Sequence, residues 1–322
     1  MGVFALVSAV GIVVDDRILV GVPIWTKPFK FSVSLLAYTL SLAWMISLLH
    51  RGRRVAWWAG TVVAAASAAE MVLITVQVIR GKRSHFNHAT PFDDALFQIM
   101  GISILMLWLA ALVIAMLLLR AKILDRAMAW AVRLSSLIAL AGAALGFLMV
   151  RPTPEQLAVE KSPIIGAHAV GVPDGGPSMP LTGWASNGGD LRIPHFFGMH
   201  ALQLLPLLLL VLAALAPRFA RLADERVRLR LTLTASAAYT ATFVLLTWQA
   251  LRGQALFAPD GATLAGAGAI VLLGGAATAL SLRGASPSPS PTPSSPPSPP
   301  TSSPSSPDPR PAPAPSEREV TS

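Results

Sequence analysis

Histidine is the residue type in this chain that most clearly indicates chemistry. Five of the six histidines lie in or beside polar segments, namely His85, His88, His168, His195 and His200. Imidazole is a common ligand of metal ions and haem and carries protons near neutral pH. The distribution therefore predicts a histidine-rich polar site.

The first polar segment is SHFNHATPFDD, residues 84–94. His85 and His88 are three residues apart, which places them on one face if the segment is helical. Asp93 and Asp94 stand at the start of the next apolar run, where carboxylates suit the positive end of a helix dipole. We weigh two interpretations: an interfacial loop with a helix cap, or a site in which both histidines and a carboxylate join residues 195–200.

The second polar segment, NGGDLRIPHFFGMHALQLLP, covers residues 187–206 and leads into a long apolar run. Its polar side chains are Asp190, Arg192, His195, His200 and Gln203. His195 and His200 are about 140° apart on an ideal helix, so one ion cannot bind both. We expect His195 to face the polar site and His200 to lie deeper, with Gln203 on the same face. The alternative is that His200 and Gln203 form a packing hydrogen bond.

Glu70 lies near the middle of another apolar run, with Gln77 on a similar face and Gln98 near the start of the following run. An ionisable residue inside a membrane helix is costly and indicates a function by default. The alternative is a protonated glutamate that bonds to a neighbouring helix.

Composition sets the class of protein. The 322 residues are 53% hydrophobic and only 13% charged, with a mean hydropathy of +0.61. Soluble domains carry about 25% charged residues, and the apolar runs here have the roughly 20-residue length that crosses a bilayer. We predict an all-α polytopic transmembrane bundle whose main partner is the lipid bilayer.

Charge and cysteine content exclude other classes. The formal charge is +9, but the cations mostly flank apolar runs, where they orient helices, so we exclude nucleic acid as a partner. The chain has no cysteine, which leaves histidine, carboxylate and methionine as metal ligands and excludes thiolate sites.

The apolar runs predict seven confident helices and a topology. Their ranges are 31–50, 55–79, 93–119, 127–150, 194–216, 230–251 and 262–282; residues 1–14 are apolar but short, and whether they span is left open. The basic loops 51–54, 120–126 and 217–230 fall on one side, which the positive-inside rule makes cytoplasmic. Loops 80–92, 151–193 and 252–261 then lie outside, with the histidine-rich segments, and the C-terminus is cytoplasmic.

We expect two regions: a helix bundle over 1–283 and a Ser/Pro-rich disordered cytoplasmic tail over 284–322, because that composition has nothing apolar to bury. The outer loop 151–193 is long enough to be a lid or binding element. Asp174 and Trp184 favour a lid over the histidines, and Trp184 suits the membrane interface.

The stretches GVPDGGPSMPLTGW and GDLRIPHFFGMHALQ resemble a motif of uncharacterised bacterial multi-pass membrane proteins, and SHFN and TKPFKF are similar to other parts of that pattern. The resemblance covers most of the membrane portion but not the tail. It implies a bacterial cytoplasmic membrane and brings no activity, cofactor or substrate.

Three functions remain open, and the sequence identifies no catalytic residue or enzyme class. The first is a b-type haem or divalent-metal protein, with His85, His88 and His200 as the metal-ligand candidates. The second is a proton-coupled transporter that uses Glu70, with a small-molecule ligand at the outer face. The third is a structural or sensor protein, and a membrane enzyme with His and Asp acid–base groups is a further alternative.

Overall fold

A computed structural model describes residues 1–283; the tail predicted to be disordered, residues 284–322, lies outside the described residues. The helices are α1 (Gly2–Val14), α2 (Thr26–Ser47), α3 (Arg53–Ile79), α4 (Pro91–Arg120), α5 (Arg126–Ala144), α6 (Gly146–Met149), α7 (Pro154–Leu157), α8 (Arg192–Leu215), α9 (Ala220–Ala223), α10 (Glu225–Leu251) and α11 (Gly261–Arg283). The strands are β1 (Ile18–Leu19), β2 (Val22–Pro23), β3 (Ala169–Val170) and β4 (Gly189–Asp190), paired as β1–β2 and β3–β4. The prediction of an all-α polytopic bundle is confirmed.

Within residues 1–283, seven helices are long and apolar enough to cross a membrane. They match the seven predicted runs with three differences of five or six residues at their ends: α5 ends at Ala144, six residues before the predicted end, α10 begins at Glu225, five residues before the predicted start, and α2 begins at Thr26, also five residues early. This last difference places Lys27 and Lys30 on the first turns of a helix instead of in a loop. Helix α1 has 13 residues, which gives about 20 Å at 1.5 Å per residue, short of a bilayer core of about 30 Å.

Local sequence sets several helix ends. The hydroxyl of Thr90 accepts a hydrogen bond from the backbone N–H of Asp93 at the start of α4, and Asp125 caps α5 by accepting from Met128. Such caps satisfy N–H groups that have no partner within the helix.

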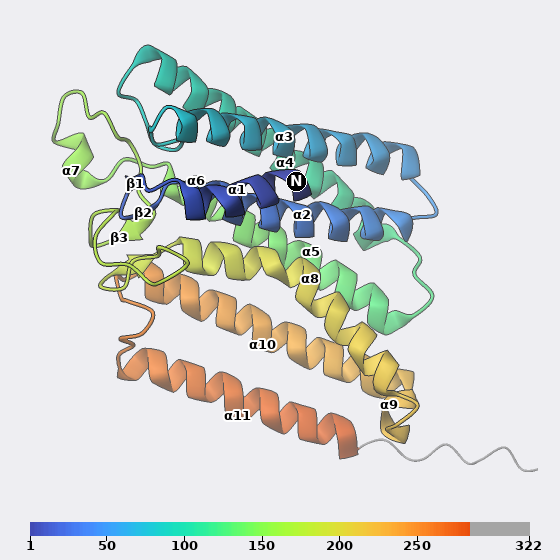
Figure 1. Ribbon diagram of the computed structural model, residues 1–322. Helices are drawn as coiled ribbons and strands as arrows, with labels where there is room; N and C mark the ends of the chain where they lie inside the picture. The colour runs from blue at the N-terminus through green and yellow to red at the C-terminus, as the bar shows by residue number, and fades with distance from the viewer. Residues whose placement is uncertain (284–322) are drawn as a thin grey trace, which may run out of the picture. The chain divides into compact units, whose positions relative to one another are not determined.

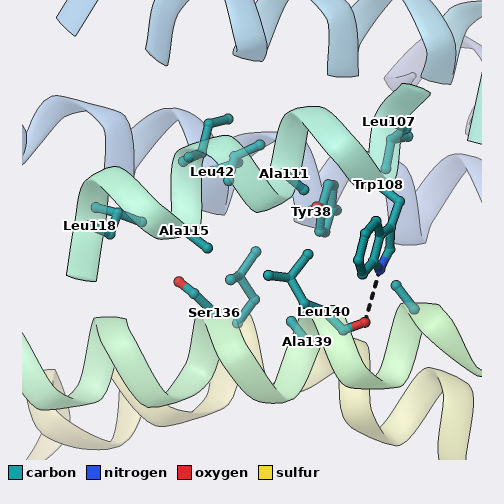
Figure 2. A pocket seen from close by; sticks show the side chains of 13 residues that line it. Tyr38, Leu42, Leu107, Trp108, Ala111, Ala115, Leu118, Ser136, Ala139 and Leu140 are labelled. Atoms are coloured by element: carbon teal, nitrogen blue, oxygen red, sulfur yellow. Dashed lines mark hydrogen bonds between the residues drawn. The ribbon is translucent and has the colours of Figure 1, made fainter. Parts of the chain in front are cut away.

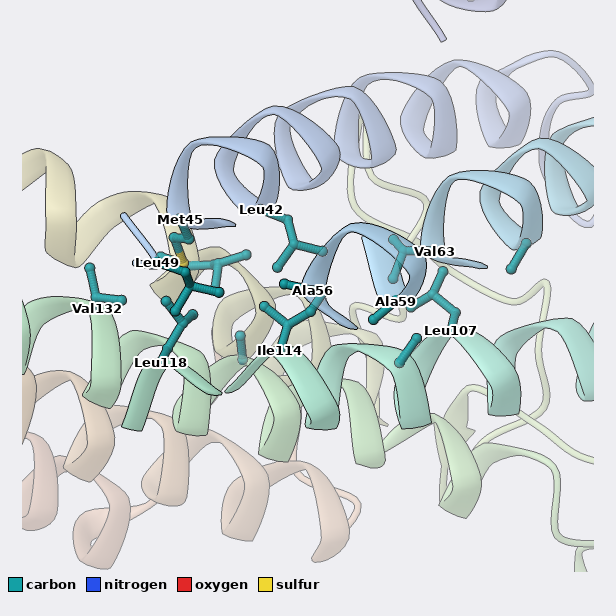
Figure 3. Packing of buried hydrophobic residues seen from close by; sticks show 14 residues of the cluster. Leu42, Met45, Leu49, Ala56, Ala59, Val63, Leu107, Ile114, Leu118 and Val132 are labelled. Carbon is teal, nitrogen blue, oxygen red and sulfur yellow. The ribbon is translucent and has the colours of Figure 1, made fainter. Parts of the chain in front are cut away.

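Helices α2, α3, α4 and α5 share the largest buried cluster (Figure 3). Met45, Ile114 and Leu118 in this cluster are completely or almost completely buried. Between α2, α4, α5 and α8 a small apolar cavity of about 20 Å³ remains (Figure 2). Its volume is close to that of one water molecule, so it is not a ligand site. The indole N–H of Trp108 donates across it to the carbonyl of Leu140 at 3.1 Å.

Helices α5 and α8 pack closely because glycine faces glycine. A Cβ built on Gly198 would lie 2.6 Å from the Cα of Gly142 and 2.8 Å from the Phe243 ring. Close approach through small residues is a common way for membrane helices to associate. This contact fixes the first turns of α8, which carry Arg192.

The connections 15–25, 80–90, 145–191 and 252–260 lie together at one end of the bundle, called the loop end here (Figure 1). They contact one another: Asn87 pairs with Ile164 in a β-bridge, and β3 pairs with β4 with Ala169 opposite Asp190. The ends of α2, α3 and α8 meet these loops, and their side chains form the site.

Candidate functional site

A polar cavity of about 120 Å³ lies at the loop end and is called the loop-end pocket here. Its walls come from four stretches far apart in the sequence: residues 19–31, 78–86, 168–184 and 192–196. The stretches TKPFKF, SHFN, DGGPSMPLTGW and GDLRIPHF thus each contribute residues to one cavity.

Among the charged side chains of the lining, cations predominate: Lys27, Lys30, Lys82, Arg83 and Arg192. The only acidic residue in the lining is Asp174. Clefts lined by charge of one sign concentrate ions of the opposite sign. The pocket is therefore suited to an anion.

Arg192 is held rigidly at the start of α8. Its Nε and Nη2 donate to the two carboxylate oxygens of Asp190 at 2.9 and 2.6 Å, and Nη2 also donates to the carbonyl of Gly183 at 3.0 Å. Asp190 is buried and also accepts the backbone N–H of Ala185 at 2.7 Å. Nη1 forms no hydrogen bond within residues 1–283, so a fixed guanidinium edge remains available to a ligand.

Lys30 and Lys27 lie one turn apart on α2. The ammonium of Lys30 donates to the Thr182 carbonyl at 2.5 Å, which leaves two of its three N–H donors. The ammonium of Lys27 forms no hydrogen bond or ion pair within the described part of the chain and lies 5.7 Å from the centre of the Phe31 ring. Both lysines offer unused donors to the cavity.

Two helices begin beside this group of cations. Helix α2 has no side chain that caps its first turn and no acidic residue there. At the start of α8 the carboxylate of Asp190 accepts the backbone N–H of Arg192 at 2.9 Å. Helix N-termini carry partial positive charge, so the dipole of α2 adds to the side-chain charges, whereas Asp190 offsets the dipole of α8.

Four aromatic rings also line the wall, beside aliphatic side chains: Phe31, Phe86, Trp184 and Phe196. Trp184 and Phe196 stack with ring centres 6.0 Å apart. A ligand that fits this pocket therefore combines a negative charge with an apolar or aromatic part.

His168 and Asp174 form a hydrogen-bonded pair on the loop side of the pocket. Nδ1 of His168 lies 2.8 Å from a carboxylate oxygen of Asp174, which also accepts the backbone N–H groups of His168 and Ala169. Burial raises the pKa of Asp174, but the hydrogen bonds from His168 and the backbone outweigh it and hold that pKa well below its usual range. Burial lowers the pKa of His168, and the charges of Arg192 and Lys27 lower it further against the effect of Asp174.

His85 also lines the pocket, between the rings of Phe31 and Phe97. Its Nδ1 lies 3.2 Å from the hydroxyl of Ser84. Burial, followed by the charges of Lys27 and His168, lowers the pKa of His85 well below its ordinary value. A neutral imidazole in this position is an uncharged polar group of the wall.

The other predicted histidines lie outside the pocket lining. His88 pairs with Asp94 at 2.5 Å, and residues 84–88 are not helical, so the helical spacing proposed for His85 and His88 does not apply. His195 does not face the pocket as expected, because its Nδ1 bonds to the Gly142 carbonyl of α5 at 2.8 Å. His200 lies 3.2 Å from the amide oxygen of Gln203 one turn along the same helix, so the contact lies within α8 and joins no second helix.

Gln77 and Gln98 take part in contacts between helix ends. The Gln77 amide donates to Asp93 at 2.9 Å and joins α3 to α4, and Arg80 bonds to both residues. Gln98 donates to Asp94 at 2.7 Å. Each of these contacts satisfies polar groups near the loop end.

Glu70 is completely buried in α3, and neither carboxyl oxygen has a hydrogen-bond partner within residues 1–283. The hydroxyl of Ser67, one turn away, is also buried without a partner. Lys27 is close enough for its charge to act on Glu70. A buried carboxyl group without a partner is energetically costly, so Glu70 stays a candidate functional group.

Within residues 1–283, no three histidine, aspartate or glutamate side chains lie together in a way that holds a metal ion. His85, His88 and His200 bond separately to Ser84, Asp94 and Gln203. The predicted three-histidine metal set therefore gains no support from the geometry.

The sequence prediction did not include Lys27 and Lys30 among the site candidates, because both precede the first predicted span, 31–50. A signal was present, since Lys27, Lys30 and Phe31 have the spacing of one helix face and the two lysines lie on the side that the positive-inside rule depletes of cations.

Comparison with protein-family models, with curated proteins and with solved structures finds no match to this chain. Function is therefore argued from the site alone. The structure establishes an integral membrane protein by the length and composition of its helices.

Proposed function

We propose that this protein binds an anionic small molecule with an apolar or aromatic part in the loop-end pocket. The observation that carries the proposal is the convergence of Lys27, Lys30 and Arg192 on one aromatic-walled cavity. Arg192 has Asp190 as its counter-ion, whereas neither Lys27 nor Lys30 forms an ion pair within the described residues, although Glu70 lies close enough to Lys27 for their charges to interact.

Electrostatics supports an anion over a neutral ligand. Two ammonium groups on neighbouring turns, beside a helix N-terminus, repel each other and the helix dipole. A bound anion removes this repulsion, and hydrogen bonds between charged partners contribute about 1.5–3 kcal/mol each. Binding of an anion therefore stabilises this site more than it stabilises a pair of lysines on an exposed surface.

Size supports a small ligand group. The pocket volume of about 120 Å³ is close to that of an engineered cavity of about 150 Å³ that binds benzene. One aromatic ring, or a similar apolar group, fits between the rings while a sulfonate, phosphate or carboxylate reaches the cations.

The proposal includes the orientation from the positive-inside rule: the loop end faces outward from a bacterial cytoplasmic membrane and the C-terminus is cytoplasmic. Three basic loops, 51–54, 120–126 and 217–230, lie at the opposite end of the helices from the pocket. Together they carry eleven lysines and arginines, against ten at the loop end once Lys27, Lys30 and Arg192 are counted with the loops there, which favours this orientation.

The geometry favours an anion site over the haem or metal hypothesis. Among the candidate ligands, His200 is the histidine nearest the membrane interior. It contacts Gln203 and the ring of Phe196. The pocket offers cations where a divalent metal requires acidic or neutral donors.

Titration of nanodisc-embedded protein with benzenesulfonate tests the proposal, with benzyltrimethylammonium as the cation of similar size. We expect saturable binding of the sulfonate only, about 10- to 100-fold weaker in Lys27→Gln or Lys30→Gln because each removes a charge-assisted hydrogen bond. Lys161→Gln is the matched control, since Lys161 is an exposed lysine of the 145–191 connection at the loop end, outside the pocket lining. Equal binding of both probes, or equal affinity of all three variants, contradicts the proposal and leaves the structural or sensor alternative.

A second candidate function, proton-coupled transport of the anion, is favoured by the unpartnered buried carboxyl of Glu70. Intramembrane carboxyl groups serve as proton sites in carriers. In proteoliposomes we expect Glu70→Gln to abolish anion uptake driven by a pH gradient while benzenesulfonate binding persists. Unchanged uptake in Glu70→Gln removes this candidate.

A further inference from the structure

His168 is a pocket residue with one ring nitrogen, Nε2, that has no hydrogen-bond partner within residues 1–283. Asp174 occupies its Nδ1, and two backbone N–H groups fix Asp174 in turn. The ring packs against Phe86, with centres 4.7 Å apart. Because His168 lines the cavity, its Nε2 is the ring nitrogen that remains for a ligand.

The tautomer follows from this arrangement. An ionised carboxylate only accepts hydrogen bonds, so Nδ1 carries the proton and neutral His168 presents a lone pair at Nε2. A lone pair repels an anion that has no proton to donate. The same nitrogen donates to that anion once it is protonated.

The charges around His168 come from several elements. Asp174 of its own loop favours the protonated ring, whereas Arg192 of α8 and Lys27 of α2 oppose it. His85 of the 80–90 connection and His195 of α8 are also near enough to interact with a charged His168. The empty pocket therefore has two cations acting against protonation of His168 and one carboxylate that supports it.

We infer that the loop-end pocket binds its anion together with one proton, and that Nε2 of His168 is the atom that takes this proton. The inference rests on the proposed anion site. An anion bound to Lys27 and Arg192 offsets their charges and adds a negative charge beside the imidazole. Protonation then gives the anion an additional N–H donor, while Asp174 balances the new charge at Nδ1.

Linkage fixes the direction of the pH effect. Because the anion stabilises protonated His168, protonation strengthens anion binding by the same factor. Affinity therefore rises as pH falls through the range between the pKa of His168 in the complex and its lower pKa in the empty pocket, by at most tenfold per pH unit for one proton.

Isothermal titration of nanodisc-embedded protein with benzenesulfonate tests the inference, in buffers that differ in ionisation enthalpy. This probe stays ionised throughout the range, so proton uptake belongs to the protein. At about pH 6 we expect the protein to take up almost one proton per bound anion, and at about pH 8 almost none, because a histidine side chain titrates between these two pH values. In His168→Asn, which retains an N–H donor for Asp174, uptake at about pH 6 should disappear and the affinity should lose its pH dependence.

Two further variants separate the outcomes. His88→Asn changes a histidine of the loop end outside the pocket lining and should keep full proton uptake. Uptake that persists in His168→Asn but is lost in His85→Asn overturns the assignment to His168. Binding without proton uptake in the wild-type protein overturns the inference while leaving the anion site intact, whereas absence of binding contradicts the proposed function itself.

Discussion

At the scale of single residues, the site is recognised by side chains in unfavourable places. Lys27 and Lys30 stand on the first turns of α2, where the helix dipole disfavours positive charge. Positions where the residue type does not suit the local structure tend to be functional. Asp190 serves a different purpose, because it fixes the geometry of Arg192 from a buried position.

The first prediction concerns Asp174, which holds the loop segment 168–174 in place. Asp174→Asn removes the charge from three hydrogen bonds, each worth about 1.5–3 kcal/mol when one partner is charged. We expect a lower melting temperature in nanodiscs and faster proteolysis within residues 151–191. Unchanged values for both would show that Asp174 does not hold the loop.

The pH dependence of stability gives a second prediction with a defined sign. The pKa of Asp174 is held below its usual value of about 3.9, so its stabilising effect is present above about pH 4 and is lost as pH falls further. The pKa of His168 is also lowered, so neutral His168 favours the folded loop above about pH 6.5, and acid removes this effect. We expect the melting temperature to fall from pH 7 to pH 5, less so in His168→Asn; a rise on acidification contradicts the account.

At the scale of elements, the close packing of α5 on α8 positions Arg192 over the pocket. Gly198→Ala would place a Cβ 2.6 Å from the Gly142 Cα, and overpacking of this kind costs about 1–3 kcal/mol. Gly101→Ala in α4 is the matched control, since its Cβ meets nothing within 4 Å. Thermal unfolding should show a loss of stability for Gly198→Ala alone; equal behaviour of the two variants argues against the tight contact.

The helices were largely predictable from the sequence, and the contacts between loops were not. Apolar runs bounded by cations and prolines gave all seven spans to within about six residues, because span length is set by bilayer thickness. The pairings of Asn87 with Ile164 and of Ala169 with Asp190 join residues far apart in the chain, and no local pattern indicates them. Sequence analysis named Asp174, Trp184 and Arg192 as site candidates, whereas Lys27, which precedes the first predicted span, was not among them.

At the scale of the whole molecule, orientation decides which compartment the pocket opens to. The chain has no cysteine, so single cysteines report topology without background. Lys161→Cys lies at the loop end and Leu124→Cys at the opposite end, and both positions are exposed. In intact cells a membrane-impermeant maleimide should label Lys161→Cys only; labelling of Leu124→Cys instead would reverse the orientation.

The most direct test of the anion site is to locate a bound ligand. We would determine the structure with 4-iodobenzenesulfonate and find the iodine by its anomalous scattering. The account predicts one strong iodine site among Phe31, Trp184 and Phe196, with the sulfonate at Lys27 and Arg192 and density lost in Lys27→Gln. Iodine found only at other surfaces, with the loop-end pocket empty at saturating ligand, would contradict the account.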